Sequence, residues 1–154
     1  MSKLFSRRRI VQGLMAAAAL VAMPLSAFAR NSEAFGLGDF AKAQSTMFGG
    51  EDIADGSDGI TLELPDIAES PAKTNVKVKV DESKLGMLKS ITFMAEANPT
   101  PISAKFYFSA RVEPELETFI KLAGTTMVHA IVETDKGLYS ASKEVKATLG
   151  GCGG

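Results

Sequence analysis

An alternation of apolar and polar residues runs through most of the chain from Ile60 to Leu149 and constrains its fold more than any other feature. Residues at every second position of a strand lie on the same face of a sheet, so this pattern predicts strands with one buried face. The predicted strands are ITLELP (60–65), NVKVKV (75–80), SITFMAE (90–96), ISAKFYFSA (102–110), ETFIKL (117–122), TMVHAIVETD (126–135) and GLYSASKEVKATL (137–149).

The segments between these strands are short and carry turn-forming residues, such as Asn98-Pro99-Thr100-Pro101 and Asp135-Lys136-Gly137. About seven strands at regular spacing, with no helices between them, predict a mainly β fold: an antiparallel, immunoglobulin-like β-sandwich. A barrel is the alternative. With one Cys and no Trp the chain lacks the Cys–Trp–Cys core of antibody domains. The predicted core includes Val76, Val78, Val80, Ala104, Phe106, Phe108, Val128, Ala130, Val132, Val145, Ala147 and Leu149.

A different pattern precedes the strands. Residues 31–48 have helical spacing of apolar side chains, and Gly49-Gly50 ends this predicted short helix. Residues 51–59 are acidic and rich in turn formers. Their aspartates lack the alternate spacing and closing Glu of a calcium-binding EF-hand loop, so a solvated loop is predicted.

The first residues have the composition of a targeting segment. Basic residues are followed by a short apolar run (13–23) and by Ala27-Phe28-Ala29, which suits a signal cleavage site. The run is shorter than the roughly 20 residues of a membrane-spanning helix, so a signal peptide is favoured over an anchor. Cleavage after Ala29 would remove four positive and no negative charges and change the formal net charge from −1 to −5. Such an acidic protein is a poor candidate for binding nucleic acid or anionic lipid.

Within this segment, Ser6-Arg7-Arg8-Arg9-Ile10-Val11-Gln12 resembles the twin-arginine export signal, which carries folded proteins. A Sec signal with an arginine-rich start is the alternative. We therefore expect a periplasmic protein with four parts: a signal peptide (1–29), a helix and acidic loop (30–59), the β-sandwich (60–149) and a C-terminal arm (150–154).

The arm contains the chain's single cysteine, Cys152, which cannot form an internal disulfide. Glycine has no Cβ and wide conformational freedom, so the arm should be flexible and thin, with a reach of roughly 15–17 Å. It can therefore present a thiol inside a narrow channel of another protein. Two alternatives are an incidental cysteine in a terminus and an exported adhesion domain that dimerises through Cys152. The flexible glycines are Gly150, Gly151, Gly153 and Gly154.

The rest of the chain has no complete active site. A thiol enzyme needs a pocket and a base around the cysteine, which a glycine tail does not offer. The single histidine, His129, lies on the strand face opposite the predicted core, so we expect an exposed or partner-facing side chain there, with Met127 and Ile131 as a partly apolar candidate interface. No motif indicates a metal or a cofactor. The sequence thus predicts a carrier rather than an enzyme.

The ending VKATLGGCGG (145–154) is similar to the C-terminal signature of the SoxY family, the sulfur carriers of bacterial thiosulfate oxidation. The resemblance extends to the twin-arginine signal, the helix and the acidic loop, and to the segments LELPDIAES (62–70), EANPTP (96–101) and KLA (121–123). Departures are mild: Ala147 stands where Val is commoner, and EANPTP replaces a closely similar Asn-Pro-x-Pro form.

The resemblance implies a covalent cycle on Cys152. A c-type cytochrome enzyme would join the thiol to thiosulfate as an S-thiosulfonate, and a hydrolase would release sulfate and leave a persulfide. The remaining sulfur would be oxidised by a sulfur dehydrogenase or passed to storage. The resemblance also implies a heterodimer with SoxZ, a second small β-sandwich protein without its own signal, and no cofactor in the carrier itself.

Overall fold

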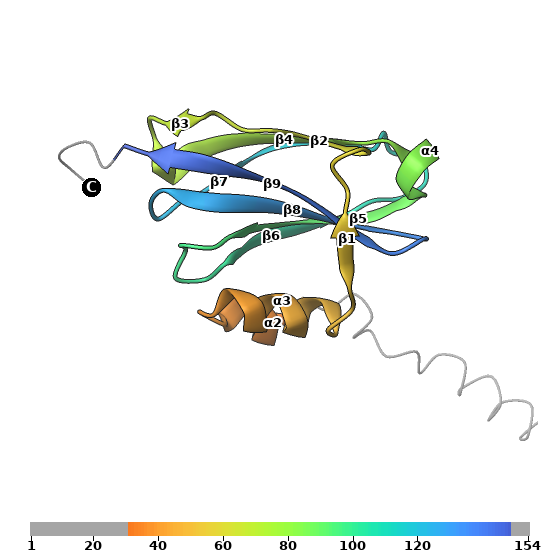
Figure 1. The fold of residues 1–154 in the computed structure, drawn as a ribbon, viewed down its shortest axis with the longest axis horizontal. Coiled ribbons are helices and arrows are strands. Elements are labelled where there is room, and N and C mark those ends of the chain that lie inside the picture. The colour runs from red at the N-terminus through yellow and green to blue at the C-terminus, as the bar shows by residue number, and fades with distance from the viewer. Residues whose placement is uncertain (1–30, 149–154) are drawn as a thin grey trace, which may run out of the picture. The chain divides into compact units, whose positions relative to one another are not determined.

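The computed structural model describes residues 31–148, which form three layers (Figure 1). A smaller sheet with the strand order β2-β4-β7 packs on a larger sheet with the order β1-β9-β8-β5-β6, and β3 also pairs with β9. Two helices, α2 and α3, pack on the other face of the larger sheet. The mainly β sandwich is therefore as predicted.

All seven predicted strands are present among the described residues. The smaller sheet contains β2 (Ile60–Glu63), β4 (Thr74–Val80) and β7 (Glu115–Ile120). The larger sheet contains β1 (Ile53–Asp55), β3 (Ile67–Ala68), β5 (Leu88–Ala95), β6 (Ile102–Tyr107), β8 (Thr126–Thr134) and β9 (Leu138–Ala147). The helices are α2 (Ser32–Gly36), α3 (Phe40–Phe48), α4 (Glu82–Leu85) and the 3-10 turn η2 (Pro71–Lys73).

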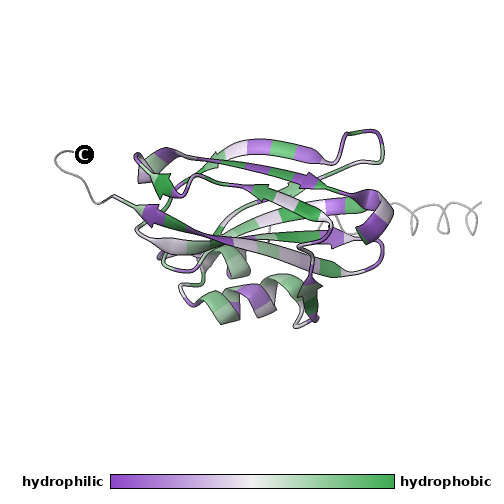
Figure 2. Cartoon of the chain, turned by 45° about the horizontal axis from the view of Figure 1, so that its top comes forward, coloured by the Kyte–Doolittle hydropathy of each residue, from purple (hydrophilic) through white to green (hydrophobic). Residues whose placement is uncertain are grey.

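The main core lies between the two sheets. Alternate residues of the strands point into it, as the banded colouring of the strands in Figure 2 indicates. Phe93 is fully buried at its centre, and its ring meets the half-buried ring of Phe106 edge-on, with the centroids 6.2 Å apart. Burial of these side chains is the main stabilising contribution to the fold. The most buried core side chains include Val76, Val78, Ile91, Val128, Val132 and Val145.

A second core lies between the larger sheet and the helices. Residues 31–48 form two helices rather than the single one predicted, because Leu37 is extended (φ −76°, ψ 136°). Each helix has its own cap: the Asn31 side chain accepts from the Ala34 amide, and the Asp39 side chain accepts from the Lys42 amide. As predicted, the second helix ends at Gly49, which has a left-handed conformation (φ 67°).

These helices correct the expected candidate interface. Met127, His129 and Ile131 share a strand face, but this face is covered by the chain's own helices, and Ile131 is only 2% exposed. The expectation that Ile131 faces solvent or a partner is therefore wrong. The strand pattern predicts which residues share a face, but it does not reveal that a helix covers the second face.

The acidic segment also differs from the predicted loop. Its residues Ile53–Asp55 form β1, which pairs in parallel with β9, and Gly56 is buried. A second short strand, β3, pairs in parallel with the end of β9. The sandwich is therefore not purely antiparallel. Strands this short contain too few residues to show a period-two pattern.

Candidate functional site at the base of the C-terminal segment

The candidate thiol lies beyond the last strand. Strand β9, whose arrowhead points to the left in Figure 1, ends at Ala147, and Thr148 is the last described residue. Cys152 and the four glycines predicted to surround it lie outside the described residues. What the structure defines is the base from which residues 149–154 continue.

Hydrogen bonds from two neighbouring segments hold this base. The Lys146 amide donates to the Asp66 carbonyl at 3.0 Å, next to the parallel pairing of β3 with β9. On the same side, Thr148 Oγ1 donates to the Ala68 carbonyl of β3 at 3.3 Å, and on the other side the Ala147 amide donates to Thr125 Oγ1 at 3.0 Å. The end of β9 is thus fixed from both sides, up to the residue before the candidate arm.

A lysine earlier in β9 ties the same segments together. Lys143 Nζ donates to the Leu64 carbonyl at 2.7 Å and forms an ion pair with Asp66 Oδ1 at 2.8 Å. The hydrogen bond from Lys143, and then its positive charge, lower the pKa of the Asp66 carboxyl from its usual value. Because the Asp66 side chain is 88% exposed, solvent screens this pair and its contribution to stability is small.

A fixed base sets where the thiol can act. Cys152 follows Thr148 by four positions, so the cysteine can lie no more than roughly 13 Å along the chain from Thr148, at about 3.3 Å per residue. The only other side chain beyond Thr148 belongs to Leu149. The arrangement suits a tethered thiol offered to other proteins.

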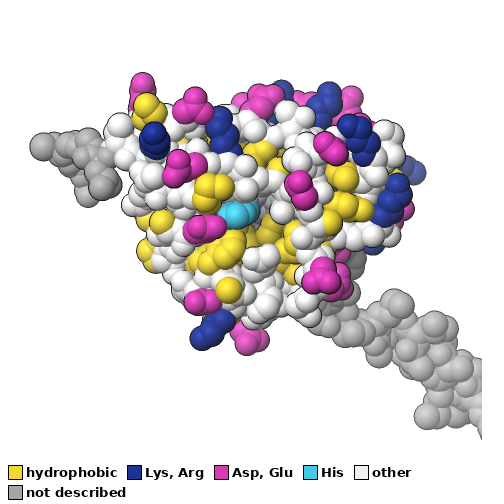
Figure 3. Space-filling view, in the orientation of Figure 1, with side chains coloured by type: hydrophobic (Ala, Val, Ile, Leu, Met, Phe, Trp, Pro, Cys, Tyr) yellow, Lys and Arg dark blue, Asp and Glu magenta, His cyan; other side chains and the backbone are white. Residues whose placement is uncertain are grey.

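His129 has a structural environment. Its Nε2 lies 2.8 Å from Glu96 Oε1, and its ring packs on Phe40 of α3 with centroids 5.0 Å apart. The side chain is 20% exposed. Figure 3 shows the histidine at the surface beside acidic and apolar side chains. His129 therefore links strand β8 to the N-terminal helices of its own chain, rather than standing free for a partner.

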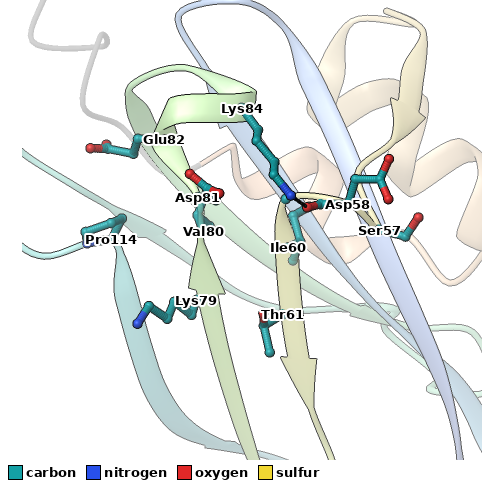
Figure 4. Close-up of a pocket in the computed structure, with 11 residues that line it drawn as sticks. Ser57, Asp58, Ile60, Thr61, Lys79, Val80, Asp81, Glu82, Lys84 and Pro114 are labelled. Atoms are coloured by element: carbon teal, nitrogen blue, oxygen red, sulfur yellow. Dashed lines mark hydrogen bonds between the residues drawn. The ribbon is translucent and has the colours of Figure 1, made fainter.

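A polar hollow of about 600 Å³ lies at the end of the smaller sheet where β2 begins and β4 ends (Figure 4). Lys84 Nζ donates there to the Asp58 carbonyl at 2.6 Å, and Lys79, Asp81 and Glu82 also line the hollow. This end of β4 is opposite the end near η2 and the base of the arm. The hollow combines both signs of charge with no converging set of donors for one ligand, and we assign it no role.

Two further features concern the described residues alone. Between residues 31 and 148, no group of three or more His, Cys, Asp or Glu side chains is arranged to hold a metal ion. In the same part of the chain, no helix is long and apolar enough to cross a membrane.

Sequence reasoning did not identify the residues that hold the base. Asp66, Thr125 and Lys143 are separated from their partners by tens of residues, and each is an ordinary polar residue in its local pattern. The Glu96–His129 pair, 33 positions apart, was missed for the same reason. No local motif signals such contacts.

Comparisons with known proteins agree with the resemblance in the sequence. The family model described as "Sulfur oxidation protein SoxY" matches residues 44–152. Among solved structures, the sulfur carrier protein SoxY from Chlorobium limicola f thiosulfatophilum is similar, with 28% identity and a TM-score of 0.60. The match covers 72% of this chain and 97% of that one.

A variant of the superoxide reductase (neelaredoxin) from Ignicoccus hospitalis is also similar, with 20% identity and a TM-score of 0.50. The match covers 58% of this chain and 79% of that chain. At this identity the likeness concerns the fold alone. No match was found among curated proteins.

Proposed function

This chain belongs to the SoxY family of sulfur carriers in sulfur oxidation, and we propose that it carries thiosulfate-derived sulfur covalently on Cys152. Its role is that of a carrier rather than an enzyme. The reactions on the thiol would therefore be catalysed by the proteins that receive the arm.

One observation carries the proposal: the match to the family extends through the sandwich as far as residue 152, the only cysteine of the chain. The fixed base at Thr148 supports it, because Cys152 follows a defined point by only four positions. An unperturbed cysteine has a pKa of about 8.5, so only a small fraction is thiolate near neutral pH. No charged residue lies between Lys146 and Cys152, so no sequence neighbour on that side favours the thiolate, and we expect the receiving enzyme to activate the sulfur.

The proposed first step joins the Cys152 sulfur to the outer sulfur of thiosulfate. The thiol loses its proton, two electrons leave to a c-type cytochrome enzyme, and an S–S bond forms to give Cys–S–S–SO₃⁻. In the second step, water attacks the sulfonate sulfur and sulfate leaves. The second sulfur remains on the cysteine as a persulfide. A sulfur dehydrogenase would then take electrons from the outer sulfur, with water as the source of oxygen, to give Cys–S–SO₃⁻, and a second hydrolysis would release sulfate and return the thiol. Alternatively, the outer sulfur would be transferred to a sulfur store.

The proposed partners follow from the family. They are a SoxZ-type β-sandwich protein, bound as a stable heterodimer, and the enzymes that act on the arm in turn. Covalent attachment keeps the reactive sulfur species from diffusing away between these enzymes. A tether about 13 Å long allows each enzyme to bind the thiol while the carrier stays folded.

The proposed location is the periplasm, reached by the twin-arginine route after folding. The supporting feature is Ser6-Arg7-Arg8-Arg9, followed by the short apolar run and the cleavage site at Ala29. Export in the folded state would let a signal-less partner cross the membrane already bound to this chain.

Intact-mass measurement tests the covalent role. The purified protein is incubated with thiosulfate and the coupling cytochrome enzyme, and an added mass of one thiosulfate should appear on the peptide containing Cys152. Cys152→Ser should keep the fold and the heterodimer but form no adduct. An adduct on another residue, or one that persists in Cys152→Ser, would contradict the proposal. So would sulfur transfer by a Cys152-linked disulfide dimer.

Cell fractionation tests the route. The double variant Arg7→Lys, Arg8→Lys keeps every positive charge of the signal but removes the arginines that the twin-arginine machinery reads. We expect it to stay in the cytoplasm while the wild type reaches the periplasm. Arg9→Lys, one position further on, is the matched control when the pair is read as Arg7-Arg8. Unchanged export of the double variant would indicate the Sec route instead.

A further inference from the structure

We propose that the free edge of β6 is the docking site of the stable partner, which adds a strand of its own to the larger sheet. This inference rests on the heterodimer of the proposed function and assigns it a surface. It starts from the strand pairing: among the described residues β6 pairs with β5 on one side only.

The register shows which main-chain groups are free. Tyr107 lies opposite Ser90 in the antiparallel pair, and the Phe108 amide donates to the Lys89 carbonyl at 2.8 Å. In an antiparallel ladder, hydrogen-bonded residues alternate with residues whose amide and carbonyl point away from the neighbouring strand. The main-chain groups of Tyr107 and of Lys105 therefore point outward. Only another extended main chain offers donors and acceptors at the matching spacing.

Apolar side chains at this end of the edge are unusually exposed, beside one exposed cation, Arg111. Tyr107 is 70% exposed and Val112, in the segment after β6, is 56% exposed. Phe108 between them is half-buried. The one charged side chain of the strand, Lys105, is turned onto the sheet face, where its Nζ lies 3.2 Å from Glu133 Oε2 and only 11% of the side chain is exposed. Its Nζ also lies 5.3 Å from the centroid of the Tyr107 ring, so the one charge of β6 lies over the sheet face and not along the outward main-chain edge.

The neighbouring edge strand shows the opposite character. Strand β7, the edge of the smaller sheet, follows Pro114 and exposes Glu115 and Glu117. It also exposes Phe119 (53%), whose ring has Lys73 Nζ 4.4 Å from its centroid. Proline and charged side chains on an edge strand are common devices against unwanted strand pairing. Protection of β7 beside an unprotected β6 indicates that β6 is covered in the working protein.

The distance between this end of β6 and the base of the arm suits a partner that stays bound while enzymes act on the thiol. Tyr107 is level with Ser90, Glu133 and Leu138 across the sheet, and Thr148 follows Leu138 by ten positions. At about 3.3 Å per residue this is roughly 33 Å, beyond the roughly 13 Å available to the thiol. A partner on this end of β6 leaves the base of the arm open to enzymes.

A second protein is favoured over a second copy of this chain. The proposed mature chain has a formal net charge of −5, so two copies repel each other at long range. A partner of lower negative charge with a free strand edge has no such penalty. The SoxZ-type β-sandwich protein of the proposed function has the architecture that offers such an edge.

The test is the dissociation constant of the heterodimer, measured by titrating purified SoxZ-type partner into the carrier. Tyr107→Ser removes the ring but keeps the outward amide, and should weaken binding about tenfold. Tyr107→Pro also removes that amide, at an edge position where proline is tolerated, and should weaken binding further. Ile67→Ser is the matched control: Ile67 is 53% exposed beside the base of the arm, and binding should not change.

Amide hydrogen exchange gives a second readout that the proline variant does not affect. In the wild type, the amides of Lys105 and Tyr107 should exchange more slowly once the partner is bound. Three results would overturn the proposal: equal affinity for both Tyr107 variants and wild type, no protection of these amides, or no heterodimer at all. If the adduct on Cys152 still forms, the carrier function stands: the first two results would then refute the docking surface alone, and the third would also refute the proposed heterodimer.

Discussion

The larger sheet is closed differently at its two edges. At β9, the chain's own short strands β1 and β3 pair with the edge, and Lys143 joins it to the Leu64 carbonyl of the segment before β3. At β6, no further strand of the described chain is paired. The covered edge leads into the candidate arm, and the open edge ends in exposed Tyr107.

This difference shows how one small sandwich could hold the base of the arm at one edge and bind the proposed partner at the other. Under the proposed function, an edge that leads to the carrier thiol must not fray, because the position from which residues 149–154 continue would then be undefined. Pairing with β1 and β3, together with the bonds at Ala147 and Thr148, prevents this. An edge that receives a partner must keep its main-chain groups free. The two requirements exclude each other on one strand and are met on opposite edges.

The largest expected effect comes from placing a carboxylate in the interior beneath the covered edge. Val145 is fully buried in β9, so Val145→Asp should destabilise the protein by about 3–5 kcal/mol, the range for an uncompensated buried charge. Tyr107→Asp, at a 70% exposed position of β6, should cost less because the carboxylate stays in water. Urea unfolding measures both. Equal losses would show that the two edges are packed alike.

A smaller effect is expected from crowding the contact behind β1. A Cβ on Gly56 would lie 2.5 Å from Ile60 Cδ1 and 3.0 Å from Tyr139 Cβ. Gly56→Val should therefore push β1 away from β9 and cost about 1–3 kcal/mol, as overpacking does. Thermal unfolding measures the loss.

Gly124→Val is the matched control, because no atom lies within 4 Å of a Cβ added there. It should leave the midpoint nearly unchanged. A comparable drop in both variants would mean that the loss comes from glycine replacement in general and not from displaced β1.

Whether the sequence pattern predicts a strand depends on the length of that strand. The alternation from Ile60 onward correctly predicts the long strands and the burial of Val76 and Val145, because each strand repeats the pattern several times. Strands β1 and β3 are too short to show it. The exposure of Ile131 was mispredicted because its burial depends on helices that are distant in sequence.

The candidate site likewise has a part that the sequence predicts and a part that only the structure shows. The cysteine and its glycines are read directly from the sequence, but the residues that fix the base are not. Thr125 and Lys143 act through contacts to residues 22 and 79 positions away. Their polarity fits a solvent-exposed strand or loop equally well, so only the folded arrangement distinguishes them from other polar residues.

The smallest effect concerns the ion pair on the covered edge. The pKa of Asp66 is lowered in the folded state by the hydrogen bond from Lys143 and then by its charge, so the pair contributes stability above the usual carboxyl value of 3.8. That contribution is lost as the pH falls through the lower folded-state pKa. Asp66→Asn should therefore lower the unfolding midpoint slightly at about pH 7, and the difference from wild type should vanish at about pH 2.

Glu69→Gln is the control, because it removes the same charge from the same exposed segment, and none of the four ion pairs found among residues 31–148 involves it. A difference between Asp66→Asn and wild type that persists at about pH 2 would mean that the loss is not ionic. The Asp66 carbonyl still accepts from the Lys146 amide in Asp66→Asn, so main-chain pairing of β3 with β9 remains in both proteins. Closure of the gap at low pH would then show that the difference at about pH 7 comes from the ion pair, with main-chain pairing unchanged.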